Sequence, residues 1–251
     1  ASQINFLKRL TSIPLEIGNI THDVIAELLK MVRKDSGKAK YKSLIDFSER
    51  ECKRQLKERC FFEKYYKQKE EIKLDDLFRK VKNCLDSFRQ SKWKNWLFAE
   101  GIKESEKWII EPAGYGETRV GGGKAYLKVD FIFPKNGRVV VLDWKTGKRD
   151  STKHKNQLIG YVYYASKQFE VGVDTIDAHI IYLGDEYGEL IADVNDFDIS
   201  NFEDKVREET ENMYEYCSGI EENSPLPKEE FQMIENLNIC KFCNYKELCG
   251  R

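Results

Sequence analysis

The sequence predicts an α/β (α+β) fold in which a mixed central sheet is flanked by helices. Two patterns carry this prediction. Apolar residues recur at helical spacing in the first hundred residues, and β-rich runs bounded by turn residues follow them. The chain of 251 residues is long enough to bury a sizeable core as one domain. In chain order, we expect helices at 16–34, 42–70 and 74–91, strands at 107–112, 117–120, 125–133 and 138–145, a helix at 153–169, a strand at 177–183 and a helix at 202–217.

We expect a single domain across residues 1–251, without internal repeats or low-complexity tracts. Within it, residues 36–100 are predicted to form a helical insertion, and residues 101–200 the sheet core that carries the candidate site. Residues 225–251 form a C-terminal module that contains several cysteines. The segment 224–227 contains prolines, which predict a loop ahead of this module.

The clearest local feature is a β-hairpin within residues 128–148, KVDFIFPKNGRVVVLDWKTGK. The dipeptide Asn136-Gly137 is a strong signal for a two-residue turn. With such a turn, the register places Asp130 opposite Asp143, with their Cβ atoms about 4.5–5.5 Å apart. A four-residue loop would leave the two acids diagonal, but still on one face. Either register predicts a pair of carboxylates that could bind one metal ion.

The end of the second hairpin strand carries charged side chains after the apolar run 139–142. Because strand side chains alternate faces, Asp143 and Lys145 point one way and Leu142 and Trp144 the other. Charges at the end of a buried strand are costly unless they are paired or bound to metal. An isolated Asp-x-Lys is usually a structural ion pair. The second acid in register favours a metal site with an adjacent ammonium.

The helix after this hairpin places Gln157, Tyr161 and Ala165 on one face, because they recur every fourth residue. Gln157 and Tyr161 could hold a phosphate or a metal-bound water. By themselves such residues are more often structural. Downstream of two acids and a lysine, they favour a role in the same site.

These motifs together resemble the PD-(D/E)xK nuclease superfamily, and most closely its RecB-like branch. That branch includes the CRISPR-associated iron–sulfur single-strand exonucleases and the AddB nuclease domain. Its members carry Gly-x-x-x-His on a helix upstream of the sheet, and this chain has Gly18-Asn19-Ile20-Thr21-His22 followed by DVIAELLKMV. The resemblance covers residues 14–249, more loosely over 40–100. It implies a restriction-endonuclease-like core of αβββαβ order.

The resemblance also implies roles for the site residues. His22, Asp130, Asp143 and the backbone carbonyl of Trp144 would bind Mg²⁺ or Mn²⁺, and oxygen ligands suit both cations. Lys145 would orient or deprotonate the attacking water and stabilise the negative charge of the transition state. In the same way, the resemblance implies that Gln157 and Tyr161 position the scissile strand.

A second constellation lies at the C-terminus, where Cys240, Cys243 and Cys249 follow a C-x2-C-x5-C spacing. Clustered thiols in a chain without a secretory signal favour metal over disulfides. The resemblance implies a [4Fe–4S] cluster that uses this triplet and one distant N-terminal cysteine; zinc and free thiols are the alternatives. No cysteine precedes residue 18, and we expect that an N-terminal segment carrying it is missing. Alternative donors would be Cys52, Cys60 and Cys217.

Charged residues make up 34% of the chain, yet the formal net charge is −1, so no global basic field is present. The charge is distributed unevenly, and residues 185–235 are strongly acidic. We expect Lys148, Arg149, Lys153 and Lys155 to bind nucleic acid through its phosphates. The wider basic group that we expect around the site also includes Lys135, Arg138, Lys145 and His154.

The resulting functional prediction is a Mg²⁺- or Mn²⁺-dependent DNA exonuclease that acts on single-stranded or frayed ends. Recombination, repair or CRISPR adaptation would be its setting, with a protein partner from one of these pathways. The alternative is a non-catalytic nucleic-acid-binding or scaffold protein that retains the fold. A restriction-type endonuclease is disfavoured because no second DNA-reading domain is evident. No run of 18 apolar residues is present, so we expect no membrane span and a cytoplasmic location.

Overall fold

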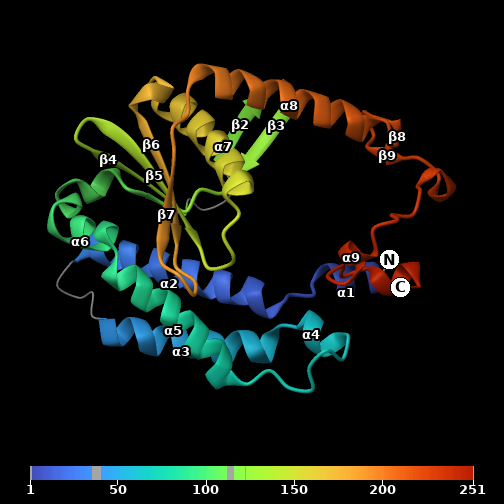
Figure 1. Ribbon diagram of the computed structural model, residues 1–251, viewed down its shortest axis with the longest axis horizontal. Coiled ribbons are helices and arrows are strands. Elements are labelled where there is room, and N and C mark those ends of the chain that lie inside the picture. Colours follow the sequence, from blue (N-terminus) through green and yellow to red (C-terminus); the bar gives the residue numbers. More distant parts are fainter. Residues whose placement is uncertain (1, 36–40, 112–115, 122, 251) are drawn as a thin grey trace.

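The computed structural model describes residues 2–35, 41–111, 116–121 and 123–250, and its centre is a mixed five-stranded sheet of order β1-β4-β5-β6-β7 (Figure 1). Neighbouring strands are antiparallel except for β5 and β6, which run parallel. Helix α7 connects these two strands, because parallel neighbours need a long crossover. The strands are β1 (Ile109–Ile110), β4 (Phe131–Lys135), β5 (Arg138–Lys145), β6 (Ile176–Tyr182) and β7 (Gly188–Ala192).

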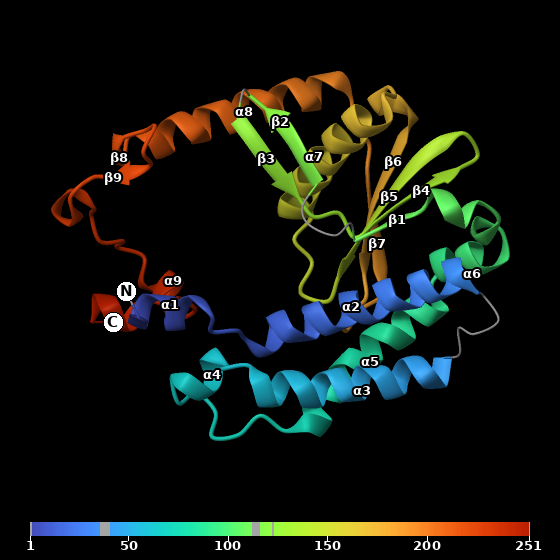
Figure 2. The same ribbon diagram turned by 180° about the vertical axis from the view of Figure 1, so that it is seen from behind.

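Helices cover both faces of the sheet and bury a separate apolar cluster on each (Figures 1 and 2). One cluster joins Phe131, Leu142 and Trp144 of the sheet to α2, α3, α5 and α6. The other joins Ile132 and Val141 to α7 and α8. The helices are α2 (Ile13–Lys34), α3 (Tyr41–Glu58), α5 (Leu74–Gln90), α6 (Lys92–Ala99), α7 (Ser151–Phe169) and α8 (Asp196–Tyr214). This arrangement confirms the predicted mixed α/β fold and the αβββαβ core.

Helix α2 begins three residues earlier than predicted. Ser12 caps it by accepting a hydrogen bond from Leu15 N, and Pro14 in the first turn has no N–H to satisfy. Its buried face includes Ile20 and Val24, which lie against the sheet side of the first cluster. The helix therefore carries residues 18–22 along the edge of the sheet.

The predicted strand 125–133 is wrong, because the chain changes sheets within it. Residues 123–127 form β3 (Gly123–Leu127), which pairs with β2 (Gly116–Val120) in a separate two-stranded sheet. Residues 128–130 belong to no strand, and β4 begins at Phe131. Of the predicted strand 107–112, only Ile109–Ile110 form a strand, which is β1. Residue 112 lies outside the described residues. Because of the break at 128–130, Asp130 lies directly before the first residue of β4.

Other boundaries also differ from the sequence prediction. Strand β7 was not expected, and α8 begins at Asp196, six residues before the predicted start. An Asn195–Asp198 capping box accounts for that start. The predicted helical region 42–70 contains α3 and the short α4 (Phe62–Tyr65).

The C-terminal segment leaves α8 and returns to the N-terminus, so the two chain ends lie side by side (Figures 1 and 2). Its contacts are polar. Glu247 accepts hydrogen bonds from Gln3 Nε2 at 2.6 Å and from Tyr65 OH, and Asn244 Nδ2 donates to Leu10 O. The remaining elements are α1 (Ser2–Lys8), β8 (Cys217–Gly219), β9 (Ser224–Pro225), α9 (Leu237–Cys240) and 3-10 turns at Gly101–Lys107, Val173–Thr175, Lys228–Glu230 and Lys246–Cys249. The division into insertion, sheet core and cysteine module stays a prediction.

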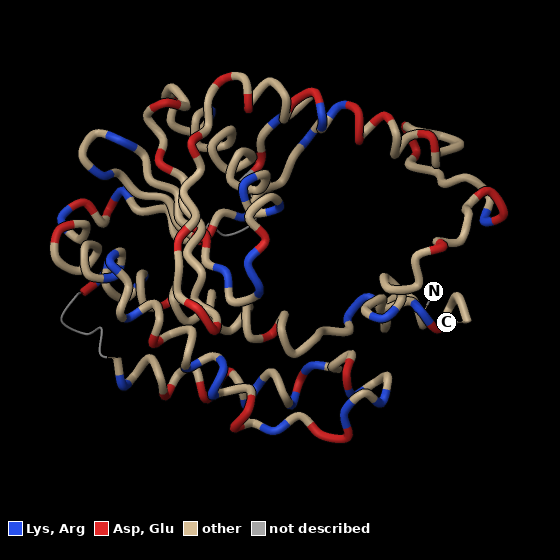
Figure 3. The backbone as a smooth tube through the Cα atoms, in the orientation of Figure 1, with Lys and Arg blue, Asp and Glu red and all other residues tan. Residues whose placement is uncertain are grey.

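Charges of both signs alternate along the helices that flank the sheet (Figure 3). Many are neighbours on one helix, such as Arg79 and Asp76 or Lys205 and Glu209. Exposed pairs of this kind add little stability each. None of the described helices is both long and apolar enough to cross a membrane.

Candidate active site

The β4–β5 hairpin has the predicted register. Lys135 pairs with Arg138 and Phe131 with Leu142, and Asp130 and Asp143 are the residues that flank this last pair. Asn136 and Gly137 have φ values of 52° and 76°. Positive φ at both positions is what a two-residue type I′ turn requires. The turn thus sets which side chains meet at the far end of the hairpin.

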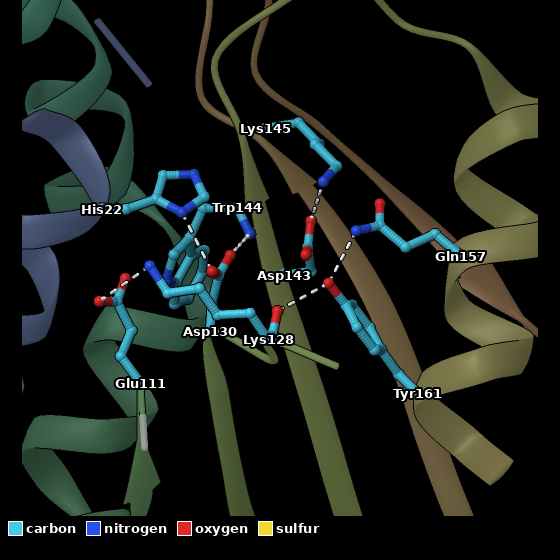
Figure 4. Close-up of polar contacts among 9 residues, drawn as sticks. All are labelled: His22, Glu111, Lys128, Asp130, Asp143, Trp144, Lys145, Gln157 and Tyr161. Carbon is cyan, nitrogen blue, oxygen red and sulfur yellow. Dashed lines mark hydrogen bonds and ion pairs between the residues drawn. The ribbon is translucent and has the colours of Figure 1, made fainter. Parts of the chain in front are cut away.

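Asp130 is buried and is held from two sides (Figure 4). Its Oδ2 accepts a hydrogen bond from Trp144 N at 2.8 Å, and its Oδ1 lies 3.0 Å from His22 Nδ1. These contacts come from β5 and from α2, at 14 and 108 residues' separation in sequence. The orientation of the Asp130 carboxylate is therefore determined by both elements.

Asp143 lies on the α7 face of the sheet, with 2% of its side chain exposed. Its Oδ2 is 2.7 Å from Lys145 Nζ. On α7, Gln157 Nε2 donates to Tyr161 OH at 2.7 Å, and Tyr161 OH donates to Lys128 O at 2.9 Å. Figure 4 shows this group on the opposite side of Asp130 from His22. The structure thus brings together the predicted Asp130, Asp143, Lys145, Gln157 and Tyr161.

Helix α2 approaches the same strand end through Gly18. A Cβ at Gly18 would lie 3.4 Å from Thr146 Oγ1, which follows β5 directly. One turn further along α2, His22 faces Asp130. The small residue lets the helix pass close to the strand end, which explains the spacing between glycine and histidine in this chain.

Glu111 is a site residue that the sequence analysis missed. It follows β1, and its backbone N donates to Asp130 O at 3.0 Å. One ligand atom each from His22, Glu111 and Asp130 lie within 4.8 Å of one another. Among the described residues, this group does not include Asp143. The only local signal was an acid at the end of the short apolar pair Ile109-Ile110, which is too common to single it out.

The buried acids shift the pKa values of their neighbours. Burial raises the pKa of Asp143 to about 6, and the nearby Asp130 adds to this while Lys145 opposes it. Burial and Asp130 also raise the pKa of Glu111, against the effect of Lys128. For His22, burial lowers the pKa, but the attraction of Asp130 outweighs it and the net pKa is raised. Burial is thus the largest cause of the raised pKa at both acids, and the charge of Asp130 adds to it.

The donor set fits a divalent cation. One imidazole nitrogen and carboxylate oxygens are ligands for Mg²⁺ or Mn²⁺. Glu111 Oε1 is buried and has no hydrogen-bond partner among the residues that the structure describes, so it is available as a ligand atom. A bound cation would also offset the negative charge that raises the neighbouring pKa values. Trp144 contributes its N–H to Asp130, and metal binding by its carbonyl stays a prediction.

The predicted basic group does not gather as a whole. Lys135 and Arg138 lie at the turn end of the hairpin, remote from Asp143 because β5 spans eight residues. Arg138 pairs there with Asp177, and Lys135 lies over the rings of Trp93 and Trp96. Their expected place at the site is wrong. His154 is buried, with Nδ1 2.8 Å from Tyr182 OH, so it does not present a charge to solvent.

Four basic residues do remain exposed beyond the end of β5. Lys148 and Arg149 line a cavity of about 720 Å³, and Arg149 donates to Tyr187 O at 2.9 Å. Lys153 and Lys155 are exposed on the first turns of α7. Binding of nucleic acid by these four residues stays a prediction.

The C-terminal cysteines do not form the predicted metal centre. In the described part of the chain, Cys240, Cys243 and Cys249 are not brought together with a fourth group as a metal site, and all seven cysteines are free. Cys249 is exposed, and Cys243 Sγ accepts a hydrogen bond from Tyr245 N. The described cysteines are therefore not positioned as a metal site, and neither the predicted [4Fe–4S] cluster nor zinc as its alternative is shown. The short turns here lack a sheet that would direct the thiols to one point.

The model of the PD-(D/E)XK nuclease superfamily matches residues 7–250. The alignment with the solved structure of SSO0001 covers 79% of this chain and 81% of the SSO0001 chain. The sequence identity is 18% and the TM-score is 0.36. A protein from Eubacterium rectale described as a "Putative exonuclease" covers 78% and 77% at 12% identity, with a TM-score of 0.40. These likenesses are too weak to carry a conclusion. None of the curated proteins matches. Because the family model spans nearly the whole chain, this protein belongs to the PD-(D/E)XK nuclease superfamily.

Proposed function

We propose that this nuclease is a Mg²⁺- or Mn²⁺-dependent DNA exonuclease of the RecB-like branch, which acts on single-stranded or frayed ends. The observation that carries the proposal is the hairpin register, which pairs Phe131 with Leu142 and so brings the flanking Asp130 and Asp143 to the same end of the hairpin, with Lys145 Nζ 2.7 Å from Asp143 Oδ2. The Gly18–His22 motif on α2 supports the RecB-like assignment. We further propose a cytoplasmic role in recombination, repair or CRISPR adaptation, with a protein partner from that pathway.

The proposed cation ligands are His22, Asp130, Asp143 and the Trp144 carbonyl. A divalent cation held there would supply Lewis acidity to the phosphate and lower the pKa of bound water. The Lys145 Nζ lies 2.7 Å from the Asp143 carboxylate. At this position it would orient the attacking water and stabilise negative charge in the transition state.

Tyr161 and Gln157 would position the substrate strand. Burial raises the pKa of Tyr161 well above its ordinary value, and the nearby Asp143 and Asp130 add to this. The phenol therefore stays protonated and can donate a hydrogen bond at neutral pH. In the described structure it donates to Lys128 O, the residue two before Asp130. A phosphate oxygen could take the place of that carbonyl.

The test is cleavage of DNA labelled at either end, with Mn²⁺ or Mg²⁺, by the full chain. Linear single strands, circular single strands and blunt duplexes are compared. We expect linear single strands to be degraded and circles to resist. Asp143→Asn and Lys145→Met, which keep side-chain size, should abolish cleavage, whereas Lys57→Ala on the exposed face of α3 should not.

Other outcomes would redirect the proposal. Equal cutting of circles would identify an endonuclease. Cleavage that survives both site substitutions would place the chemistry elsewhere. Binding of DNA without cleavage under any metal condition would support the non-catalytic alternative.

A further inference from the structure

We propose that Glu111 is a further ligand of the divalent cation, on the His22 side of Asp130. This inference rests on the proposed metal-dependent function and adds a side chain to its cation site. Glu111 directly follows β1, and the break at 128–130 separates β3 from β4. The structure places its carboxylate with His22 and Asp130 rather than with solvent (Figure 4).

The first observation is geometric. One donor atom from each of His22, Glu111 and Asp130 lie within 4.8 Å of one another. Two oxygens that bind one Mg²⁺ at about 2.1 Å can be separated by at most about 4.2 Å. Small side-chain movements would therefore bring all three donors to one cation. Glu111 needs no backbone rearrangement, because its N–H is already bonded to Asp130 O at 3.0 Å.

The second observation is the unpaired buried carboxylate. Only 12% of the Glu111 side chain is exposed, and among the described residues its buried Oε1 has no hydrogen-bond partner. Lys128 Nζ lies 3.8 Å from its other oxygen, Oε2, on a side chain that is 54% exposed. A solvated ammonium at that distance compensates a buried carboxylate weakly. A divalent cation would provide the missing partner.

The third observation is the backbone of Glu111, which has a φ of 32°. Residues other than glycine rarely adopt positive φ, and such conformations persist where the surrounding structure imposes them. Here the backbone is held by the bond to Asp130 O, and it turns the side chain back toward His22. The backbone conformation of Glu111 thus directs its buried carboxylate toward His22 and Asp130.

Asp130 then lies between two groups of different chemistry. His22 and Glu111 are on one side, and Asp143, Lys145 and Tyr161 are on the other (Figure 4). Among the described residues, the hydrogen bond and ion pair of Glu111 are to Asp130 and Lys128, and not to Gln157 or Tyr161 of α7. Its role is therefore in cation affinity, and its removal should change metal binding in the absence of DNA.

The test is Mn²⁺ binding to the full apo chain by calorimetry, without DNA, together with the rise in melting temperature caused by Mn²⁺. Glu111→Gln should weaken Mn²⁺ binding by at least about tenfold, the lower limit for loss of a group that merely supports a metal ligand. The melting temperature of the apo variant should equal or exceed that of the wild type, because an unpaired buried charge is removed. The matched control is Glu117→Gln, an exposed acid paired with Lys124, which should bind Mn²⁺ as the wild type does.

Lys128→Met separates metal binding from a structural ion pair. If Glu111 binds the cation, this variant should bind Mn²⁺ as tightly as the wild type or more tightly, since a competing ammonium is gone. Wild-type affinity in Glu111→Gln would overturn the proposal, as would an equal loss in Lys128→Met. A third outcome separates the two proposals. If Glu111→Gln binds Mn²⁺ more weakly than the wild type but the wild type does not cleave DNA, the ligand role is supported and the nuclease activity is rejected.

Discussion

The β4–β5 hairpin and the C-terminal cysteine segment are both defined by motif spacing, but only the hairpin brings its motif residues to one point. Asp130 and Asp143 flank the last pair of the β4–β5 register, Phe131 with Leu142, and both are buried. Cys240, Cys243 and Cys249 lie on a short helix and turns, with no buried residue among those described in 237–249.

The difference is one of tertiary constraint. In the hairpin, ladder hydrogen bonds and two apolar clusters leave one register possible, because a shift by one residue would turn every side chain to the other face. The cysteine segment is held mainly by a few polar contacts to α1 and α4. Spacing therefore predicts a site reliably only where packing also determines the direction of the side chains.

The largest effect should come from the polar end of the hairpin. Lys145→Met should lower the rate of DNA cleavage by about a thousandfold, because it removes a positive charge placed to stabilise the transition state. Unfolding of the variant should remain cooperative. The measurement is single-turnover cleavage with Mn²⁺, with Lys57→Ala as control. A cleavage rate within about tenfold of the wild-type rate would show that Lys145 takes no part in the cleavage step.

The apolar side of the same strand should control stability. Trp144 is 2% exposed and packs edge-on against Phe88. Trp144→Ala should reduce the free energy of unfolding by about 3–5 kcal/mol. Phe242→Ala, in the cysteine segment at 82% exposure, should change it by less than about 0.5 kcal/mol. Urea unfolding of both variants tests this contrast, and equal losses would show that the tail is as well packed as the sheet.

Asp143 should couple stability to pH with a sign opposite to that of most acids. Its pKa rises from 3.8 to about 6 on folding, so folding favours the protonated form. Its contribution to stability is greatest below about pH 4 and falls as the pH approaches about 6. Asp143→Asn should therefore stabilise the apo protein at pH 7 by up to about 3 kcal/mol, and by much less at pH 4.

Two measurements check this linkage. Denaturant unfolding of wild type and Asp143→Asn, without divalent cations at pH 4 and pH 7, should show the difference widening with pH. If the difference in unfolding free energy were the same at both pH values, burial would not disfavour the charged form of Asp143. Added Mn²⁺ should stabilise the wild type more than the variant, because the cation compensates the buried charge.

The smallest effect concerns the attachment of the cysteine segment. Glu247→Ala removes the hydrogen bonds to Gln3 and Tyr65. We expect faster amide hydrogen exchange in residues 237–249, with no change in exchange within β5, because the two regions share no cluster. Exchange that rises in β5 as well would show that the tail supports the core.

Much of the site could be predicted from local sequence. The Asn136-Gly137 turn determines the register, and alternation determines the faces of Asp143 and Lys145. The helical spacing of Gln157 and Tyr161 determines their common face. These features depend on interactions among near neighbours in the chain, which is why simple periodicities describe them. The same reasoning failed at 125–133, where a switch between two sheets interrupts a run that looks like one strand.

The sequence by itself determined the mixed α/β fold, the opposed acids and the helix that faces them, because turn chemistry and side-chain periodicity act locally. Only the tertiary structure decided that Glu111 joins His22 and Asp130, that Lys135 and Arg138 lie remote from the site, and that the described cysteines do not gather as a metal site. Those outcomes depend on contacts between segments far apart in the chain, such as α2, β1 and β4, and no local pattern encodes such distances.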